Sequence, residues 1–452
     1  MPYHIRCRSC TYPLFKGNRK GLPLQIFNLS IERKVMNETK ESHSVYKIAL
    51  LVSISCVLQI SESLIPHPIP GLRLGLANVI TLIALVTMGL RCALEVTIMR
   101  TLLSSFIMGT FMSPTFILSF SAGVISTLVM GFFYWLAFFH RRFRLSIVGI
   151  SVIGALTHNT VQIYLAYLIL IKHPGIFVLF PWLTIGAVFM GWVTGIAAGK
   201  VCLKLNEVQG QEVAINKTQI DYSSLALNNY VSKNTFIHRL PAEIKIATIF
   251  ILSLAVLIFG NLWFYFGLFI FLAITIIISR TPLIFLFSKM KRYTSLLLIS
   301  FLFPIFLNHG NHVLLQLAYF KITTEGINTG ILFATRIIFL VLASSLLVRT
   351  TSPEDLTQGL TRILSPLLPL GISGKRIASI LSLSWMAIPI FWEMARNIIR
   401  RIDLKKVKNI RNLIPLLSDF IVTLYLETEQ VSASWEEDYL PLGYNKLSNN
   451  SD

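Results

Sequence analysis

The sequence predicts an all-α integral membrane protein, and three features support this fold class. Of the 452 residues, 54% are hydrophobic and only 13% are charged, and the mean hydropathy is +0.67. Apolar runs of roughly 18 to 25 residues, the length that crosses a ~30 Å hydrocarbon core as a helix, recur along almost the whole chain. The basic residues gather between these runs. Ordinary soluble cores cannot absorb so much apolar sequence.

Apolar segments that we expect to enter the membrane follow one another from residue 46 onward. The segment 244–278 is too long for one crossing, and Gly260-Asn261 in its middle indicates a tight turn between two helices. The expected spans are 46–64, 72–90, 92–112, 115–139, 145–171, 177–201, 244–278, 294–307 and 327–348.

The net charge of +19 lies mainly in the loops, as in the clusters 140–144 and 400–411. The positive-inside rule assigns such loops to the cytoplasm. The amino terminus is then cytoplasmic, residues 66–73 lie on the outer side, and we expect a multi-pass protein of an inner (cytoplasmic) membrane. Binding of nucleic acid is the less favoured alternative, because the clusters flank spans and lack interleaved stacking aromatics.

Residues 1–45 read as a polar leader. They lack the apolar core of a signal peptide, and the polar sequence after Met36 favours Met36 as the true start. Cys7 and Cys10 form a lone CxxC without a second pair or a histidine set, which is weak support for metal or redox chemistry. We expect no metal and no cofactor in this chain.

The composition changes abruptly after residue 203 and divides the chain. Residues 204–236, rich in Asn, Gln, Ser and Lys, read as a cytoplasmic linker. It separates a first block of about six spans, 46–203, from a second block, in which spans at 237–350 precede amphipathic sequence at 351–427. Residues 428–452 form an acidic and polar tail. Two membrane modules joined by a linker indicate a gene fusion.

The amphipathic part of the second block contains clear helix boundaries. Ser352 can cap a helix that continues with Pro353 and two acids in its first turn. Pro366 and Pro369 break that helix, and a second begins near Ser373. Such helices lie at a membrane interface or against a partner.

Enzymatic function is poorly supported. Residues 371–376, GISGKR, have the wrong spacing for a Walker A loop and lack its magnesium-binding hydroxyl residue. The chain also lacks paired aspartate-rich motifs, HExxH and GxSxG. We therefore expect that the chain is not an enzyme.

Two long strings in the first block carry a family resemblance. They are IPGLRLGLANVITLIALVTMGLRCALEVTIMRTLLSSFIMGTFMSPTFILSFSAGVIS and GISVIGALTHNTVQIYLAYLIL. They resemble the Gx transporter family, also labelled heptaprenyl diphosphate synthase component I. That family is similar to the six-helix substrate-binding S components of energy-coupling factor (ECF) importers. The resemblance implies a six-helix, S-component-like bundle.

The second block resembles the transmembrane T component of the same importers (EcfT/CbiQ-like). The strings are IHRLPAEIKIATIFIL and the segment from TEGINTGILFATRIIF to GKRIASILSLSWMAIPIFWE. In such importers the S component holds a small solute, and the T component carries it. Separate ABC-type ATPase subunits, which hydrolyse the ATP, bind cytoplasmic coupling helices of the T component. The resemblance implies this architecture in one chain, with uptake of an unidentified small-molecule substrate.

The coupling region departs from the family pattern. Family coupling helices end in Ala-Arg-Gly, whereas this chain has Ala395-Arg396-Asn397, and acidic sequence up to Asp438 replaces the second motif. This weakens the expectation of ATPase partners. Arg396 and Arg400, one helical turn apart, are the predicted remaining contacts.

Polar residues at predicted membrane depth are the candidate binding residues, because each needs a partner there. Arginines can meet an anionic group of a solute, and amides supply directional hydrogen bonds. We expect the site near the outer face, between the 66–78 hairpin and the fifth helix. The candidates are Arg73, Asn78, Arg100, His158, Asn159 and Gln162.

Each candidate also has a structural alternative. Glu95 can pair with Arg91 or Arg100, the amides can tie helices together, and His158 can be a satisfied structural histidine. Only for Arg73, in a Pro/Gly-rich loop beside a span, is ligand contact the favoured interpretation.

Small residues predict where helices approach closely. Gly191, Gly195 and Gly199 share one helix face at four-residue spacing. This face packs either within the first block or against the second block. Ala49 and Ser53 form a weaker seam, where S components meet the T component by resemblance. Arg336, inside an apolar span, is expected to meet the first block or a carboxylate, because facing lipid is costly.

Three functions fit these patterns. The favoured one is a fused membrane subunit of an ECF-type importer. The alternatives are an accessory membrane component of isoprenoid (heptaprenyl) diphosphate synthesis, and a non-transport membrane scaffold with degenerate ATPase coupling.

Overall fold

The computed structural model describes most of the chain from Ser44 to Arg401 and four residues beyond it. The chain divides into two units, Met1–Ser44 and Val45–Asp452, and the elements below are those of the second unit. Met36, Cys7, Cys10 and Arg73 lie outside the described residues, as does the 428–452 tail. The described residues are 44–62, 75–139, 145–171, 174–208, 231, 233, 235–291, 293–307, 312–317, 320–364, 374–401, 419–420 and 422–423.

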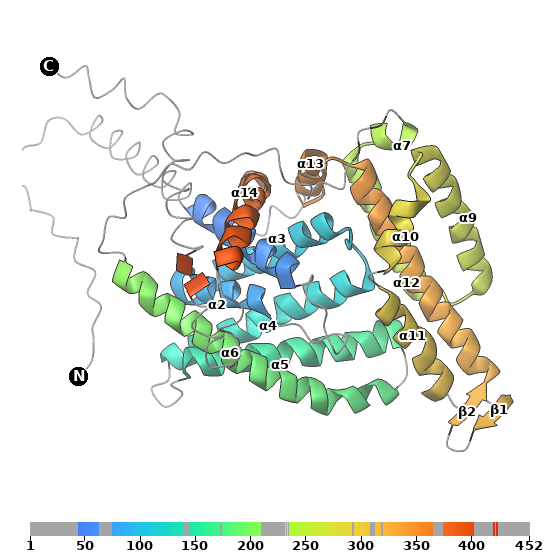
Figure 1. Ribbon diagram of the computed structural model, residues 1–452, viewed down its shortest axis with the longest axis horizontal. Coiled ribbons are helices and arrows are strands. Elements are labelled where there is room, and N and C mark those ends of the chain that lie inside the picture. The colour runs from blue at the N-terminus through green and yellow to red at the C-terminus, as the bar shows by residue number, and fades with distance from the viewer. Residues whose placement is uncertain are drawn as a thin grey trace, which may run out of the picture. The chain divides into compact units, whose positions relative to one another are not determined.

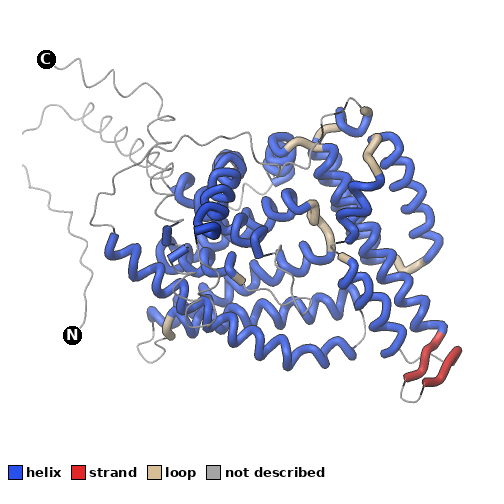
Figure 2. Tube along the Cα trace, viewed as in Figure 1, coloured by secondary structure: helices blue, strands red, loops and turns tan. Residues whose placement is uncertain are grey.

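The all-α fold class is confirmed, since helices make up nearly all of the described structure (Figure 2). Six of the described helices are long and apolar enough to cross a membrane. They are Ser44–Glu62, Pro114–Ala137, Ile147–Ile169, Pro174–Lys204, Thr324–Thr350 and Arg376–Asn397.

The first block consists of the helix Ser44–Glu62 and the helices α2 to α6 (Figure 1). Ser146 caps α5, and its Oγ accepts a hydrogen bond from the Gly149 backbone N–H at 3.1 Å. The last turns of α5 widen into a π-helix, and a 3₁₀ helix leads into α6. The bounds are α2 Leu76–Met88, α3 Leu90–Met108, α4 Pro114–Phe139, α5 Ile147–Leu165, π-helix Ala166–Ile171, 3₁₀ helix Pro174–Leu179 and α6 Phe180–Val208.

The expected span 72–90 is shorter in the structure than in the prediction. Helix α2 has 13 residues and gives way at Gly89, whose φ of 89° is open to glycine and strained for other residues. Helix α3 starts at the next residue, so α2 and α3 form a tight helical hairpin.

The second block contains α7 to α14 and one small hairpin (Figure 1). The predicted turn at Gly260-Asn261 is confirmed, because α8 ends before it and the Asn261 side chain accepts a hydrogen bond from the Trp263 N–H at 3.1 Å. The antiparallel hairpin β1–β2 was not predicted. The bounds are α7 Phe236–Arg239, α8 Ala242–Ile258, α9 Leu262–Ser279, α10 Leu283–Lys291, α11 Thr294–Leu307, β1 Val313–Leu317, β2 Phe320–Thr323, α12 Thr324–Thr350, α13 Pro353–Leu364 and α14 Gly374–Arg401.

The two predicted amphipathic helices are present as α13 and α14. The Ser352 hydroxyl accepts a hydrogen bond from the Asp355 N–H at 3.1 Å, which is the predicted cap. Helix α14 begins at Gly374, one residue after the predicted start. Helix α14 is also one of the six helices that are long and apolar enough to cross a membrane. Many of its apolar side chains pack on the first block instead.

Arg336 lies on α12 and is 2% exposed. Its Nε donates a hydrogen bond to the Tyr265 hydroxyl at 2.8 Å, and its Nη2 donates to the carbonyl of Phe259 at 3.1 Å. Arg336 was expected to contact the first block or a carboxylate, but both of these bonds go to residues of the second block that carry no carboxylate. Instead the guanidinium caps the carbonyl end of α8, where a cation is favoured by the helix dipole.

Two glycines of α6 let α5 approach closely, and Figure 1 shows the two helices side by side. A Cβ at Gly191 would lie 2.8 Å from the Cα of Val152, and one at Gly195 would lie 2.7 Å from the Cα of Val148. This is packing within the first block. Gly199 takes no part in it, because within the described structure a Cβ there would meet nothing within 4 Å.

The glycine contact gives a matched pair of variants. Gly195→Ala should lower the free energy of unfolding by roughly 1–3 kcal/mol, because the new methyl group overlaps the α5 backbone. Gly199→Ala should be neutral or stabilise the protein slightly, since alanine favours the helix. Thermal unfolding of both purified variants in detergent tests this, and equal effects would contradict the assigned contact.

Candidate functional site

The start of α2 is tied to the end of the first helix. The Gly75 N–H donates a hydrogen bond to Oε1 of Glu62 at 2.7 Å, and Gly75 adopts the left-handed conformation with φ 72°. This contact joins the two ends of the predicted outer hairpin. Arg73, the main candidate for ligand contact, lies between them outside the described residues.

Arg100 and Asn78 lie together. Arg100 is 6% exposed, and its Nη2 donates a hydrogen bond to the Asn78 side-chain oxygen at 2.8 Å. The Cys56 thiol lies 3.4 Å from the Arg100 carbonyl oxygen, so the first helix also contacts this region. The pair therefore links α2 to α3, as the structural alternative predicts, and it lies at the end of α2 that follows Arg73.

The amides of α5 belong to a different contact. The Asn159 side chain donates a hydrogen bond to the carbonyl of Leu183 on α6 at 2.9 Å, and the adjacent His158 is half-buried, as is Gln162. On the same helix α6, Thr194 lies beside Gly75. Leu183 and Thr194 are 11 residues apart, or about 16 Å of helix. The structure thus brings two of the predicted residues together on α2 and α3 and places three others at another level of the block.

A second candidate site is the contact between the two blocks. The Ser53 hydroxyl lies 3.1 Å from the carbonyl of Ser384 on α14, and the Ser384 hydroxyl donates a hydrogen bond to the carbonyl of Ala49 at 3.0 Å. All three residues are 1% exposed or less. The Ser53 hydroxyl also bonds to the Ala49 carbonyl of its own helix at 2.6 Å, so Ser53, Ser384 and Ala49 form one small network. Such contacts fit two helices whose small residues allow a close approach. Ala49 and Ser53 are the seam singled out in the sequence.

An ion pair lies beside this seam. Nη2 of Arg376 on α14 lies 3.1 Å from Oε2 of Glu95 on α3, and both side chains are less than one-third exposed. Arg91 and Arg100 were the expected partners of Glu95, whereas the described structure pairs Glu95 with Arg376, 281 residues away. Neither helical spacing nor loop composition signals such a pair.

Apolar packing joins the blocks around these polar contacts. One buried cluster contains side chains of the first helix, α2 and α3 together with side chains of α14. The α14 members are Ile377, Ile380, Leu381, Ala387, Ile388, Phe391 and Ala395. Burial of this face, which the amphipathic pattern left without a partner, supplies the main attraction between the blocks.

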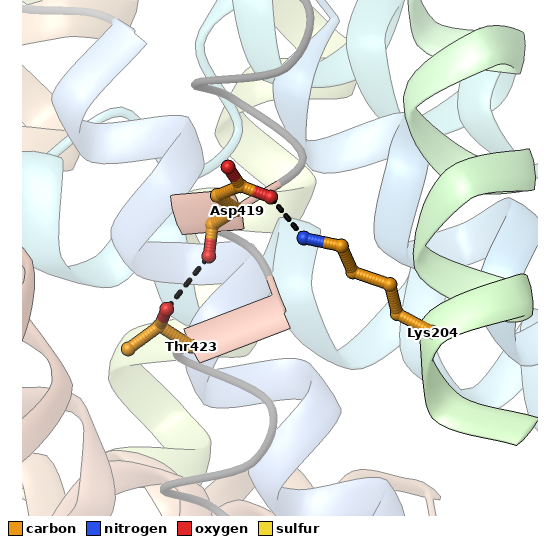
Figure 3. Close-up of polar contacts among 3 residues, drawn as sticks. All are labelled: Lys204, Asp419 and Thr423. Carbon is orange, nitrogen blue, oxygen red and sulfur yellow. Dashed lines mark hydrogen bonds and ion pairs between the residues drawn. The ribbon is translucent and has the colours of Figure 1, made fainter. Parts of the chain in front are cut away.

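A short C-terminal segment also contacts the first block. Asp419 forms an ion pair with Lys204 near the end of α6, and its carbonyl accepts a hydrogen bond from the Thr423 hydroxyl at 2.8 Å (Figure 3). Phe420 and Val422 are buried in the apolar cluster just described. The exposed ion pair adds little stability by itself, so the two apolar side chains provide most of this contact.

The predicted ATPase contacts lie at the far end of α14. Arg396 is exposed, and its guanidinium lies 6.0 Å from the centre of the Trp392 ring. Arg400 is one turn further along the same helix, and its side chain lies outside the described part. The other amphipathic helix, α13, is held against α8, where Arg362 pairs with Glu243 and Gly359 lies close to Ala242.

Within the described residues, His, Cys, Asp and Glu side chains form no group of three that could hold a metal ion. The polar groups described above have hydrogen-bonding and pairing roles.

Comparison with known proteins finds two separate matches, one in each block of the chain. A family profile described as heptaprenyl diphosphate synthase component I matches residues 51–201, and one described as cobalt transport protein matches residues 233–436. The chain is a fusion of two membrane-protein segments. The first is S-component-like and the second is a T-component-like segment, so the chain is a multi-pass membrane protein of bacterial type.

Curated relatives match the second segment. Three are named energy-coupling factor transporter transmembrane protein EcfT, and each alignment spans 221 residues, which is 47% of this chain and 83% of the relative. They come from Bacillus subtilis (27% identical), Brevibacillus brevis (29%) and Listeria innocua (26%). The alignment thus covers most of each relative and about half of this fusion.

The contact between the blocks predicts that they stay together without their linker. If a protease site is inserted in 209–230 and cut, a tag on the second block should still capture the first block. Glu95→Arg should weaken this capture by roughly 1–2 kcal/mol, a value between those of exposed and buried pairs, because it faces Arg376. Adding Arg376→Glu should restore it.

Arg91→Glu is the control, because it also reverses a charge on α3, at an exposed position. Capture unaffected by Glu95→Arg, or no recovery in the double variant, would show that the pair does not hold the blocks together.

Proposed function

We propose that the chain is the membrane subunit of an ECF-type importer. The first block (46–203) binds a small solute, and the second block (237–350 with coupling helices at 351–427) couples it to separate ATPase subunits. One observation carries the proposal: the buried Ser384 hydroxyl of α14, in the T-like segment, donates a hydrogen bond to Ala49 on the first helix of the S-like segment, and the Ser53 hydroxyl of that helix lies 3.1 Å from the Ser384 carbonyl. A movement of α14 must therefore displace the first block or break these bonds.

Helix α14 connects the two sites that such coupling requires. Ser384 contacts the first block, and Arg396 lies 12 residues further along, about 18 Å of helix. Pro389 lies between them and has no N–H to donate, so the helix can bend there. We propose that ATPase subunits engage Arg396 and Arg400, and that α14 transmits their movement across this bend to the first block.

The proposed solute is a small molecule with an anionic group. Arg73 follows Pro70-Gly71 in the sequence between the first helix and α2, and the Arg100–Asn78 pair lies on α2 and α3. His158, Asn159 and Gln162, which lie on α5 at another level of the block, stay predicted solute contacts separate from the Arg100–Asn78 pair. The proposed orientation places the amino terminus and α14 in the cytoplasm and residues 63–74 on the outer side, because the basic clusters then follow the positive-inside rule.

A second candidate function is an accessory role in isoprenoid diphosphate synthesis. The family that matches residues 51–201, heptaprenyl diphosphate synthase component I, favours this role by its description. In that role the chain would associate with a prenyl diphosphate synthase, and ATPase subunits would be absent from the purified complex. Affinity purification from the native membrane therefore distinguishes the two functions.

The importer function predicts that ABC-type ATPase subunits co-purify with the chain. Arg396→Ala combined with Arg400→Ala should lower their recovery at least tenfold, because charge-assisted hydrogen bonds each contribute about 1.5–3 kcal/mol. The measurement is quantitative mass spectrometry of the purified complex.

Arg91→Ala with Lys200→Ala is the matched control, because both side chains are exposed and the same charge is removed from the first block. Full ATPase recovery with the Arg396/Arg400 variant would show that the contact is elsewhere, and recovery of a prenyl synthase alone would support the accessory function.

The solute prediction can be examined before the solute is known. Native mass spectrometry of the gently purified chain should detect a small anionic molecule bound at about one per chain. Arg73→Ala should abolish this signal without lowering the yield of folded protein, because the guanidinium provides the charge that retains the anion. The same signal in the variant would exclude Arg73 from the binding site.

A further inference from the structure

The stretch of sequence around α9 and α10 has positive charge without local acids. From Ile244 to Thr324 the chain contains no aspartate or glutamate, yet it includes Arg280, Lys289, Lys291 and Arg292 around α10. Glu243, the acid just before this stretch, is already bonded to Arg362. The cations near α10 therefore have no acidic side chain of their own segment to pair with.

Lys233 and Arg280 are held close together. The Lys233 ammonium donates a hydrogen bond to the backbone carbonyl of Arg280 at 2.7 Å, and the Arg280 side chain is exposed. Part of this contact is structural, because Lys233 caps the carbonyl end of α9. An ammonium has three donors, however, and this bond uses one of them. The bond places a lysine ammonium beside the backbone of an exposed arginine, and two neighbouring basic residues favour binding of an external anion.

His238 lies in the same electrostatic environment. Burial lowers the pKa of His238, and the positive charges of Lys245 and Lys233 lower it further. Lys245 itself donates hydrogen bonds to the carbonyls of Thr350 and His238. The region thus disfavours an additional cation, as a site for an anion does.

Exposed apolar side chains surround these charges. On α10, Ile284 is 83% exposed and Phe287 is 70% exposed, and the nearby Ile277 and Phe236 are 73% and 70% exposed. With nine residues, α10 is about 13 Å long and too short to cross a ~30 Å hydrocarbon core. Its opposite face packs on α12 through Phe285, which lies under the Arg349 guanidinium at 4.4 Å. Such a helix lies at the level where headgroups meet acyl chains.

We propose that this surface, formed by Lys233, Arg280 and the exposed side of α10, is a binding site for an anionic phospholipid. The lipid phosphate pairs with Lys233 and Arg280, and the acyl chains lie against Ile284 and Phe287. An acidic face of a soluble protein would satisfy the charges, but it would leave the large apolar side chains in water. The site therefore matches a lipid and is independent of the solute and of ATP coupling.

Native mass spectrometry of the full chain, stripped of lipid and then mixed with phosphatidylglycerol or phosphatidylcholine, tests the proposal. Phosphatidylglycerol should bind more tightly. Lys233→Gln with Arg280→Asn should weaken its binding roughly 20- to 30-fold, because each basic residue near an anionic lipid contributes about fivefold. Asparagine is used at 280 because that residue has φ 51°, which asparagine tolerates.

Arg91→Gln with Lys200→Gln removes the same charge elsewhere and should leave the tight phosphatidylglycerol binding unchanged. Salt provides a second test on the natural chain, where 0.5 M sodium chloride should erase most of the preference for phosphatidylglycerol. Equal binding of the two lipids, or unchanged phosphatidylglycerol binding in the Lys233/Arg280 variant, overturns the proposal. So does a variant that binds phosphatidylglycerol normally but loses ATPase subunits, because the charges then serve a protein partner.

Discussion

A polar group that leaves water is costly unless it finds a partner inside the protein, and this constraint organises much of the described structure. The buried hydroxyls of Ser53 and Ser384 bond across the contact between the blocks. The Arg336 guanidinium donates hydrogen bonds to the Tyr265 hydroxyl and to the Phe259 carbonyl. The hydroxyls of Thr81, Thr97 and Thr127 follow one another from α2 through α3 to α4. Because these sites are buried, the bonds have little competition from water, and each of them helps to determine which helices are neighbours.

Structural features that are determined by a few residues adjacent in the sequence could be predicted. The turn at Gly260-Asn261 and the cap at Ser352 are properties of a few consecutive residues, and both are present. The predicted ends of helices were less accurate. At α2, for example, the apolar run continues beyond the residues that are helical. The hairpin β1–β2 joins α11 to α12, and the apolar alternation that would indicate strands is too short there to distinguish them from a helix end.

The candidate site could be predicted only in part, for a related reason. Membrane depth shows that Glu95 and Arg336 need partners, but it does not show which ones. The partner of Glu95 belongs to another segment, 281 residues away, and the acceptors of Arg336 include a backbone carbonyl, which has no signature in the sequence. Close approach was more predictable: Gly191 and Gly195 meet α5 as their spacing indicates, whereas Gly199 shares the spacing without the contact. Four-residue periodicity defines a face of a helix and leaves the length of the neighbouring helix open.

The presence of both blocks on one polypeptide, with α14 packed on the first helix, also determines stoichiometry. Translation produces the two blocks in equal numbers, and dilution cannot separate them, because each block remains at a high effective concentration around the other. A separately encoded S-like protein could occupy the surface of α14 only after it had displaced the first block from the Ala49–Ser384 contact. The first block is covalently attached and would rebind readily. The fusion therefore favours a T-like segment that works with the one S-like block attached to it, over a T-like segment shared among several separate S-like proteins.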